Sequence, residues 1–153
     1  MKKGFTLLEI LASIGIISIL VVIGVPAFQM IRNNVSLKNY SKEIASVLKI
    51  SQNDAITAQG GTTHGVYFEQ NKYYVCKDDC SSTPDPHLFN LNNGIEIISG
   101  VDEAIVFDRL SGELILSEDD KSNGITEKII QIGFPGGQQK IIQINSNGRI
   151  SIL

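Results

Sequence analysis

Cysteine and histidine are the residues of this sequence most able to bind metal or react, and they are few. The chain of 153 residues has two cysteines, Cys76 and Cys80, and two histidines, His64 and His87. The close spacing of the thiols favours a small disulfide loop, if the chain is exported to an oxidising compartment. A zinc site would need two more ligands, and His87 is the only nearby candidate. Neither histidine has a nucleophile partner visible in the sequence, so surface or hairpin roles are favoured over catalysis.

The acidic residues 118–124 are a candidate calcium loop. Three positions agree with the EF-hand pattern, but Lys121 replaces a ligand and Ile130 stands where a bidentate glutamate is needed. The sequence therefore predicts a solvated acidic turn without metal. It also contains no phosphate-binding loop, nucleophile elbow or series of metal ligands. These patterns indicate a protein that is not an enzyme and needs no cofactor. The agreeing positions are Asp119, Asn123 and Gly124.

Glu9 is the most unusual ionisable residue, because it is the single one in residues 5–25. This apolar stretch of 21 residues is long enough to cross a hydrocarbon core of roughly 30 Å as a helix. A carboxylate inside such a segment is costly and is usually paired or functional, although a position one turn from the headgroups costs less. Lys2 and Lys3 precede the stretch, so we expect a cytoplasmic N-terminus and an extracytoplasmic remainder.

The residues around Glu9 carry a specific motif. Gly4-Phe5-Thr6-Leu7-Leu8-Glu9 after a short basic leader resembles the signal of type IV prepilins and type II secretion pseudopilins. The resemblance implies cleavage between Gly4 and Phe5 by a prepilin peptidase, N-methylation of Phe5, and retention of the apolar stretch. It also implies that Glu9 meets the N-terminal ammonium of an adjoining subunit, a pairing in which each group favours the charged form of the other. Pro26 falls where many members of this family place a helix-kinking proline.

The alternative interpretation of this N-terminus is an ordinary secretory signal peptide. Small residues at positions 25–27 would allow cleavage after Ala27 and release a soluble exported β domain. However, the apolar stretch is longer than the usual 7–15 residues and contains Glu9.

Charge differs between the two parts of the chain. Residues 5–59 have four basic and three acidic residues, a net of +1, whereas residues 60–153 have seven basic and thirteen acidic residues, a net of −6. Nucleic-acid affinity comes mainly from clustered lysine and arginine. DNA binding is therefore disfavoured unless basic residues of the acidic part gather on one face. Those that would have to do so are Lys72, Lys77, Lys128, Lys140 and Arg149.

Hydrophobic periodicity predicts one long helix followed by strands. The helix is expected to bend near Pro26 without stopping, and to continue as an amphipathic segment over residues 26–59, with Gly60-Gly61 as its end. Its apolar stripe comprises Leu37, Tyr40, Ile44, Val47, Leu48 and Ala55. After it, alternation of period two and turn residues predict about seven short strands, with an exposed loop over residues 77–93. The eight candidate segments from which these strands would form are 64–69, 72–76, 94–98, 104–108, 113–116, 128–132, 140–144 and 149–153.

The expected fold class is therefore α+β. A long N-terminal helix, half of it transmembrane, packs on an antiparallel β domain in one or two sheets. The expected parts are a leader (1–4), a transmembrane and assembly helix (5–25), its amphipathic continuation (26–59) and an extracytoplasmic head (60–153). The closing strand and the order of elements resemble the GspH/FimT group of minor pilins and pseudopilins.

The resemblance implies a structural subunit that waits in the cytoplasmic (inner) membrane and then enters a pilus or pseudopilus filament. Its implied partners are other pilin or pseudopilin subunits, the prepilin peptidase and N-methyltransferase, and an inner-membrane assembly platform. Phe5, Leu7 and Leu8 would exchange lipid for protein contacts during assembly, and Glu9 would set the axial register. A DNA-binding or surface-binding minor pilin is the alternative within the same family.

Overall fold

The computed structural model describes residues 6–57, 61–78, 80 and 88–153. The predicted leader, the Gly4–Phe5 bond, the predicted helix end at Gly60 and His87 therefore lie outside the described residues. The chain divides into two compact units, residues 1–35 and residues 36–153. The second half of the predicted long helix belongs to the same unit as the strands.

Helix α1 (Leu7–Ile56) is the longest element, and residues 7–35 of it form the described part of the first unit. Pro26 lies inside this helix, which continues on both sides of it, as the sequence predicts. All of residues 6–35 are exposed within the chain. This part of α1 therefore offers its whole circumference for contacts outside the chain.

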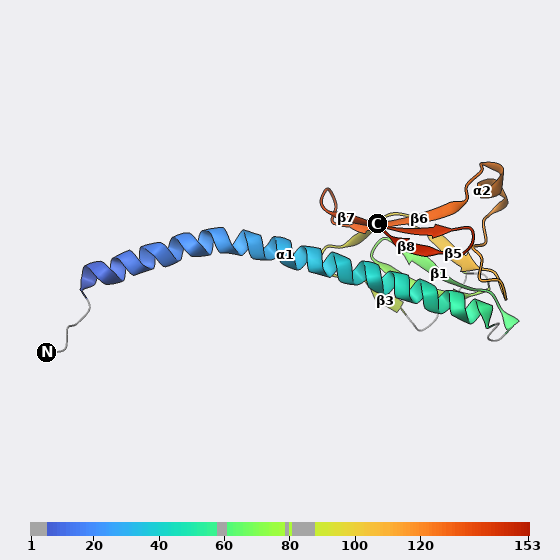
Figure 1. The fold of residues 1–153 in the computed structure, drawn as a ribbon, viewed down its shortest axis with the longest axis horizontal. Helices are drawn as coiled ribbons and strands as arrows, with labels where there is room; N and C mark the ends of the chain where they lie inside the picture. Colours follow the sequence, from blue (N-terminus) through green and yellow to red (C-terminus); the bar gives the residue numbers. More distant parts are fainter. Residues whose placement is uncertain (1–5, 58–60, 79, 81–87) are drawn as a thin grey trace. The chain divides into compact units, whose positions relative to one another are not determined.

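The second unit contains two four-stranded antiparallel sheets and the remainder of α1 (Figure 1). The first sheet has the order β3-β2-β1-β5, and the second has the order β4-β6-β7-β8. A short helix, α2 (Glu118–Ser122), lies between β5 and β6 in the chain. The strands are β1 (His64–Glu69), β2 (Lys72–Lys77), β3 (Leu88–Asn90), β4 (Glu96–Ser99), β5 (Glu103–Phe107), β6 (Glu127–Gly133), β7 (Gln139–Asn145) and β8 (Ile150–Ile152).

The core of this unit forms where α1 packs on both sheets. Every residue of the predicted apolar stripe is buried except Tyr40, which is half-buried. Ser41 and Ser51 are also buried on the helix, because small side chains let the backbone approach the sheets closely. The sheets contribute alternate residues of their strands, as period-two patterning requires. The fully buried strand side chains include Val66, Phe68, Tyr73, Ile105, Phe107, Ile130, Ile132, Ile142 and Ile144.

Three hairpins join strands that are consecutive in the chain, and their register follows the turn residues. β1 pairs with β2 around Gln70-Asn71, and β6 pairs with β7 around residues 135–137. β7 pairs with β8 after the Asn147-Gly148 turn, where Gly148 has a φ of +75°. That positive φ suits glycine, which has no Cβ to clash.

The predicted strand at residues 113–116 is wrong. Leu114 forms only an isolated bridge with Phe107. Its N–H donates instead to the carbonyl of Ser146 at 2.9 Å, whereas the N–H of Ile115 donates to Val106 at 2.9 Å. Because successive backbone donors turn toward different sheets, this segment links the two sheets and cannot extend a regular ladder with β5.

The predicted loop over residues 77–93 and the acidic turn at 118–124 also need correction. Leu88–Asn90 forms edge strand β3, because the ring of Phe89 stacks on Tyr73 of β2 at a centroid distance of 5.0 Å. The acidic residues form α2, because Ser117 and Asp120 make a capping box at its N-terminus. A side chain that caps the first turn stabilises even a short helix.

Candidate functional site

The start of α1 is capped by Thr6 and Glu9. The Glu9 carboxylate accepts hydrogen bonds from the N–H and the hydroxyl of Thr6, both at 3.0 Å, and the Thr6 hydroxyl accepts from the N–H of Glu9 at 3.3 Å. This reciprocal arrangement is a capping box, with Thr6 as N-cap and Glu9 three residues later. This capping box was not predicted from the sequence, although the spacing Thr6-Leu7-Leu8-Glu9 is its usual signal.

The capping box fixes where Glu9 presents its charge. A carboxylate in the first turn interacts favourably with the partial positive charge of the helix N-terminus. Oε2 accepts both Thr6 bonds, and a carboxylate has about four lone-pair sites in total, so capacity remains for a further donor. Glu9 is exposed in the chain. The geometry can therefore receive an ammonium group from another molecule while the helix remains capped.

The side chains beside Glu9 are apolar and exposed. Leu7 and Leu8 retain 79% and 78% of their surface, and Ile10 and Leu11 are exposed as well. An exposed apolar surface of this extent marks a site that contacts lipid or protein. The predicted assembly residues Leu7, Leu8 and Glu9 therefore lie together in the exposed first turn of α1. Phe5 lies outside the described residues.

Within the described residues, α1 is the one helix long and apolar enough to span a membrane, with a window of mean hydropathy 2.6. None of that window is buried in the chain. The hydroxyls of Ser13 and Ser18 donate to the carbonyls of Glu9 and Ile14, at 2.7 and 2.8 Å. Because these donors are satisfied inside the helix, they add little cost in an apolar environment.

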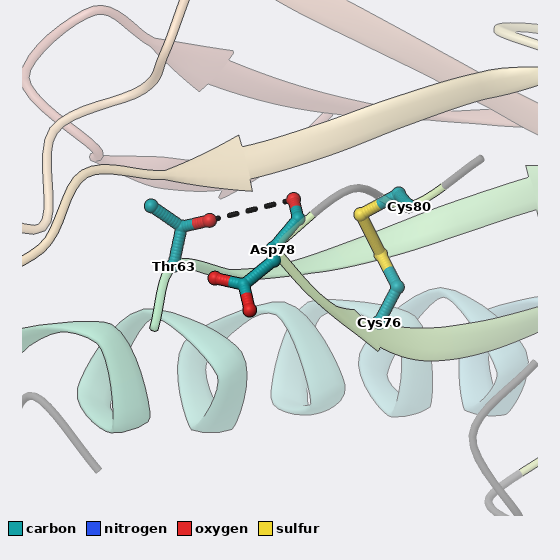
Figure 2. The surroundings of a disulfide bond; sticks show 4 residues. All are labelled: Thr63, Cys76, Asp78 and Cys80. Atoms are coloured by element: carbon teal, nitrogen blue, oxygen red, sulfur yellow. Dashed lines mark hydrogen bonds between the residues drawn. A yellow bond between two sulfur atoms is a disulfide. The ribbon is translucent and has the colours of Figure 1, made fainter. Parts of the chain in front are cut away.

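The two cysteines form a disulfide in the structure, with Cα atoms 5.1 Å apart (Figure 2). Both are buried, at 1% and 6% exposure. Asp78 between them is anchored to Thr63, just before β1: its N–H donates to the Thr63 carbonyl at 3.0 Å, and its carbonyl accepts from the Thr63 hydroxyl at 3.4 Å. The disulfide therefore closes a short loop at the end of the β1–β2 hairpin.

Lys128 on β6 forms an ion-pair cluster that was not predicted from the sequence. Its ammonium contacts Glu103 of β5 and lies 2.8 Å from the Asp120 carboxylate of α2. Hydrogen bonds from Lys128 and Ser117 hold the pKa of Asp120 below its usual value. Burial alone would lower the pKa of Lys128, but the hydrogen bonds to Asp120 and Glu103 outweigh burial and raise it. The cluster joins the two sheets and α2.

Metal-ligating groups do not gather in the described part of the chain, where no set of three or more His, Cys, Asp or Glu side chains could hold an ion. The basic residues considered for DNA are also mostly engaged: Lys72 pairs with Glu69, Lys128 joins its cluster, and Lys140 donates to the carbonyl of Leu153. A nucleic-acid interface would need free cations on one face.

Comparisons with known proteins agree with these features. Residues 1–25 match the family model described as the prokaryotic N-terminal methylation motif. No curated protein sequence matches the chain. Among solved structures, the fold is similar to that of the minor pseudopilin EpsH from the type 2 secretion system of Vibrio cholerae, with a TM-score of 0.52. The match covers 77% of this chain and 96% of the EpsH chain at 14% identity, so it supports a shared fold.

Proposed function

We propose that this chain is a minor pilin or pseudopilin of the type IV pilin and pseudopilin superfamily, a proposal supported by its N-terminal methylation motif and by its fold, which is similar to that of EpsH. It would be a structural subunit of a type IV pilus or a type II secretion pseudopilus. The observation that carries the proposal is the methylation motif, which continues into a helix whose residues 7–35 are all exposed.

Assembly would proceed through the N-terminal part of α1. The prepilin peptidase would cut between Gly4 and Phe5, and the new amino group on Phe5 would be methylated. The subunit would wait in the cytoplasmic membrane with its N-terminus cytoplasmic and residues 60–153 outside. In the filament, Leu7 and Leu8 would exchange lipid contacts for contacts with other subunits.

Glu9 would set the axial register by binding the N-terminal ammonium of a neighbouring subunit. Opposite charges within about 4–6 Å stabilise each other, and more strongly in an apolar surrounding. The capping box supports this role, because Thr6 orients the carboxylate while leaving it capacity for another donor. The remaining partners would be related pilin subunits and an inner-membrane assembly platform.

The alternative of a soluble exported domain is less well supported. Cleavage after Ala27 would have to cut α1 in its interior, since the helix runs from Leu7 to Ile56. A DNA-binding minor pilin is also less well supported, because Lys72, Lys128 and Lys140 already interact with groups of their own chain.

Intact mass and N-terminal sequence of the mature protein test the proposal, in cells with and without an active prepilin peptidase. We expect a chain that begins with N-methyl-Phe5 when the peptidase is active, and an uncleaved chain otherwise. A mature chain that begins at Phe28 in both strains would contradict the proposal and indicate a soluble exported domain.

A further inference from the structure

The turn after β5 carries an exposed apolar side chain on strained backbone. Leu110 has a φ of +75° and keeps 68% of its surface exposed. For a bulky residue this left-handed conformation is an outlier, and glycine or asparagine would adopt it at lower cost. Strain of this kind clusters at sites that contact a ligand or a partner. The side chain of Leu110 is therefore better explained by a contact than by the turn itself.

Backbone hydrogen bonds hold Leu110 in a fixed position. Its N–H donates to the carbonyl of Ala55, in the last turn of α1, at 3.2 Å. The N–H of Gly112 donates to the carbonyl of Asp108 at 3.0 Å, which closes the turn around Leu110. A side chain on a fixed turn loses little freedom when it binds. Leu110 is therefore presented as a preorganised apolar anchor.

Two neighbouring side chains determine what this anchor could bind. Ile56 is 43% exposed and lies beside the turn, because a Cβ on Gly112 would stand 2.7 Å from its side chain. Arg109 is exposed and donates to the carbonyl of Gly61 at 3.2 Å. It makes no ion pair among the residues that the structure describes. We call Ile56, Arg109 and Leu110 the Leu110 knob. Its partner should offer an apolar recess beside an acidic group.

A groove beside β4 offers such a recess. Its volume is about 350 Å³, whereas a cavity of about 150 Å³ already holds a benzene ring. The groove therefore has room for a leucine side chain. Ile98 and Val101 contribute exposed apolar surface to it, at 39% and 38% exposure. We call it the β4 groove, and its lining includes Gln70, Glu96, Ile98, Val101, Pro135 and Gln139.

Glu96 supplies the acidic group of the β4 groove. Its Oε2 accepts a hydrogen bond from Nε2 of Gln70 at 2.9 Å, and its Oε1 has no hydrogen-bond partner in the described part of the chain. The carbonyl of Gln70 accepts from the N–H of Ile97 at 2.8 Å. Because Gln70 follows β1 and Glu96 begins β4, both sheets fix the groove. One carboxylate oxygen remains able to receive a guanidinium.

The Leu110 knob and the β4 groove lie at opposite ends of β1. His64, the first residue of β1, pairs with Phe107, three residues before Leu110. Gln70 of the groove directly follows Glu69, the last residue of β1. The strand between them is about 17 Å long at 3.4 Å per residue. A chain therefore cannot place its own knob in its own groove, and the contact requires a second molecule.

We propose that the Leu110 knob of one subunit inserts into the β4 groove of a second copy of this chain, with Arg109 against Glu96. One chain carries both surfaces, and they are complementary in apolar character and in charge. The net −6 of residues 60–153 repels a second copy and weakens the contact. We therefore expect it at high local concentration, as a filament would provide.

This contact is heterologous, because each subunit contributes a different surface. Heterologous contacts that do not close into a ring generate open helical filaments. The inference thus rests on the proposed filament function and deepens it. Contacts of the N-terminal helix would hold the subunits together, and the Leu110 knob would select how neighbouring β domains meet.

Thiol cross-linking tests the contact, because the two natural cysteines are joined to each other and leave no free thiol. Glu113→Cys places a thiol beside the knob in one full-length processed chain, and Gln139→Cys places one at the groove of another. Both leave Leu110 and Glu96 unchanged. The chains are mixed in detergent with a short bismaleimide. We expect about tenfold more dimer in the mixture than in either variant alone, since a heterologous contact brings unlike surfaces together.

The anchor is tested in the Glu113→Cys chain. Leu110→Asn should lower the dimer yield about tenfold without lowering the melting temperature, because asparagine tolerates a positive φ better than leucine does. Ile129→Thr is the matched control. It changes an apolar residue of β6 that is 42% exposed and belongs to neither surface, so the dimer yield should not change.

Charge exchange tests the orientation of the contact. Arg109→Glu in the knob chain should lower the dimer yield, and Glu96→Arg in the groove chain should restore it. Circular dichroism of each variant checks that the fold is retained. Failure of the exchanged pair to restore the yield would overturn the proposal, as would an unchanged yield with Leu110→Asn.

Other occupants of the groove give a different result. If detergent or lipid filled it, Gln139→Cys would be protected from a monofunctional maleimide at every protein concentration, with or without Leu110→Asn, and the proposal would be overturned. The N-terminus of the same sample is read separately. A chain that begins with N-methyl-Phe5 but gives no dimer would reject only this contact. A chain that begins at Phe28 and gives the dimer would support the contact and reject the pilin function.

Discussion

Glu9 combines two roles that a single substitution cannot separate. Its carboxylate caps α1 through Thr6, and we propose that it also binds the amino group of a neighbouring subunit. A defect of Glu9→Ala alone would therefore fit either role. Thr6 allows the roles to be distinguished, because its removal weakens the cap and leaves the carboxylate in place.

We predict that Glu9→Gln prevents filament incorporation and that Thr6→Ala largely permits it. Glutamine keeps the size of the side chain and part of its capping ability but lacks the charge, whereas loss of an N-cap costs only about 1 kcal/mol. The measurement is the ratio of subunit in sheared filaments to subunit in membranes. Equal defects in both variants would assign Glu9 to helix capping alone, and normal assembly of Glu9→Gln would remove the charge from the mechanism.

The residues near Glu9 also show what sequence reasoning can and cannot find. The motif singles out Glu9 from the order of a few neighbouring residues, and its contact with Thr6 is equally local, whereas its role in assembly stays a prediction. The partners of Lys128 come from β5 and α2. No local pattern connects them, since only the pairing of two sheets with a capped helix brings the three charges together.

At the scale of elements, Gln52 holds two distant turns to α1. Its amide donates to the carbonyl of Gly112 at 2.8 Å and to the carbonyl of Gly148 at 2.9 Å. Both glycines have positive φ, +69° and +75°. A Cβ on Gly148 would lie 2.2 Å from the Gly112 carbonyl oxygen and 2.3 Å from the Gln52 amide nitrogen. The helix and the ends of both sheets are therefore fitted together around this glycine.

We predict that Gly148→Ala destabilises the full chain by more than about 2 kcal/mol, because strain of positive φ adds to a backbone clash. Gly136→Ala is the matched control, with a φ of +68° and nothing within 4 Å of its Cβ. It should cost only about 1 kcal/mol. Thermal melts of the detergent-solubilised proteins measure the difference. Equal melting temperatures would mean that the turns adjust without cost.

The Lys128 cluster predicts a pH dependence of stability. The pKa of Asp120 is lowered from 3.8, so its contribution is present above that pH and is lost as pH falls through the lower folded value. The pKa of Lys128 is raised from 10.5, so its contribution is present below that pH and is lost as pH rises further. The cluster should therefore stabilise the fold across the range between these limits.

The measurement is the difference in melting temperature between the wild type and Asp120→Asn. It should be constant from about pH 5 to about pH 9 and should shrink as the pH falls below 3.8. Glu118→Gln is the control, since its exposed pair with Lys121 is worth little. A difference that persists unchanged in acid would show that packing of α2, and not the charge, accounts for the effect of Asp120.

The type of an element could be predicted from the sequence where a hydrophobic repeat extends over many residues or where the turn contains characteristic turn residues. The burial of the apolar stripe on α1 and the positions of β1, β2 and β7 follow directly from spacing and turn residues. β3 was not predictable, because its three residues are specified by stacking of Phe89 on Tyr73. Segment 113–116 has strand-like alternation, but its hydrogen bonds go to two sheets.

For the whole molecule, the division at residue 35 predicts that the chain behaves as two separable parts. A chain that begins at Phe28 should be soluble without detergent and keep its β-sheet circular dichroism, because residues 36–153 contain the core. The full chain should require detergent, owing to its exposed apolar helix. Size-exclusion chromatography without detergent measures the solubility of the shorter chain and of the full chain. Aggregation of the shorter chain would show that residues 6–27 contribute to folding of the sheets.

The contrast between the turns at Gly148 and Gly136 indicates where a reporter can be inserted. Lengthening the turns at Gly112 or Gly148 would break the bonds to Gln52. The tip of the β6–β7 hairpin at Gly136 has open space around it, and exposed loop tips of this kind are the places where insertions succeed. A short affinity tag or fluorophore-binding peptide placed there would follow the subunit from membrane to filament while leaving α1 and its N-terminus unaltered.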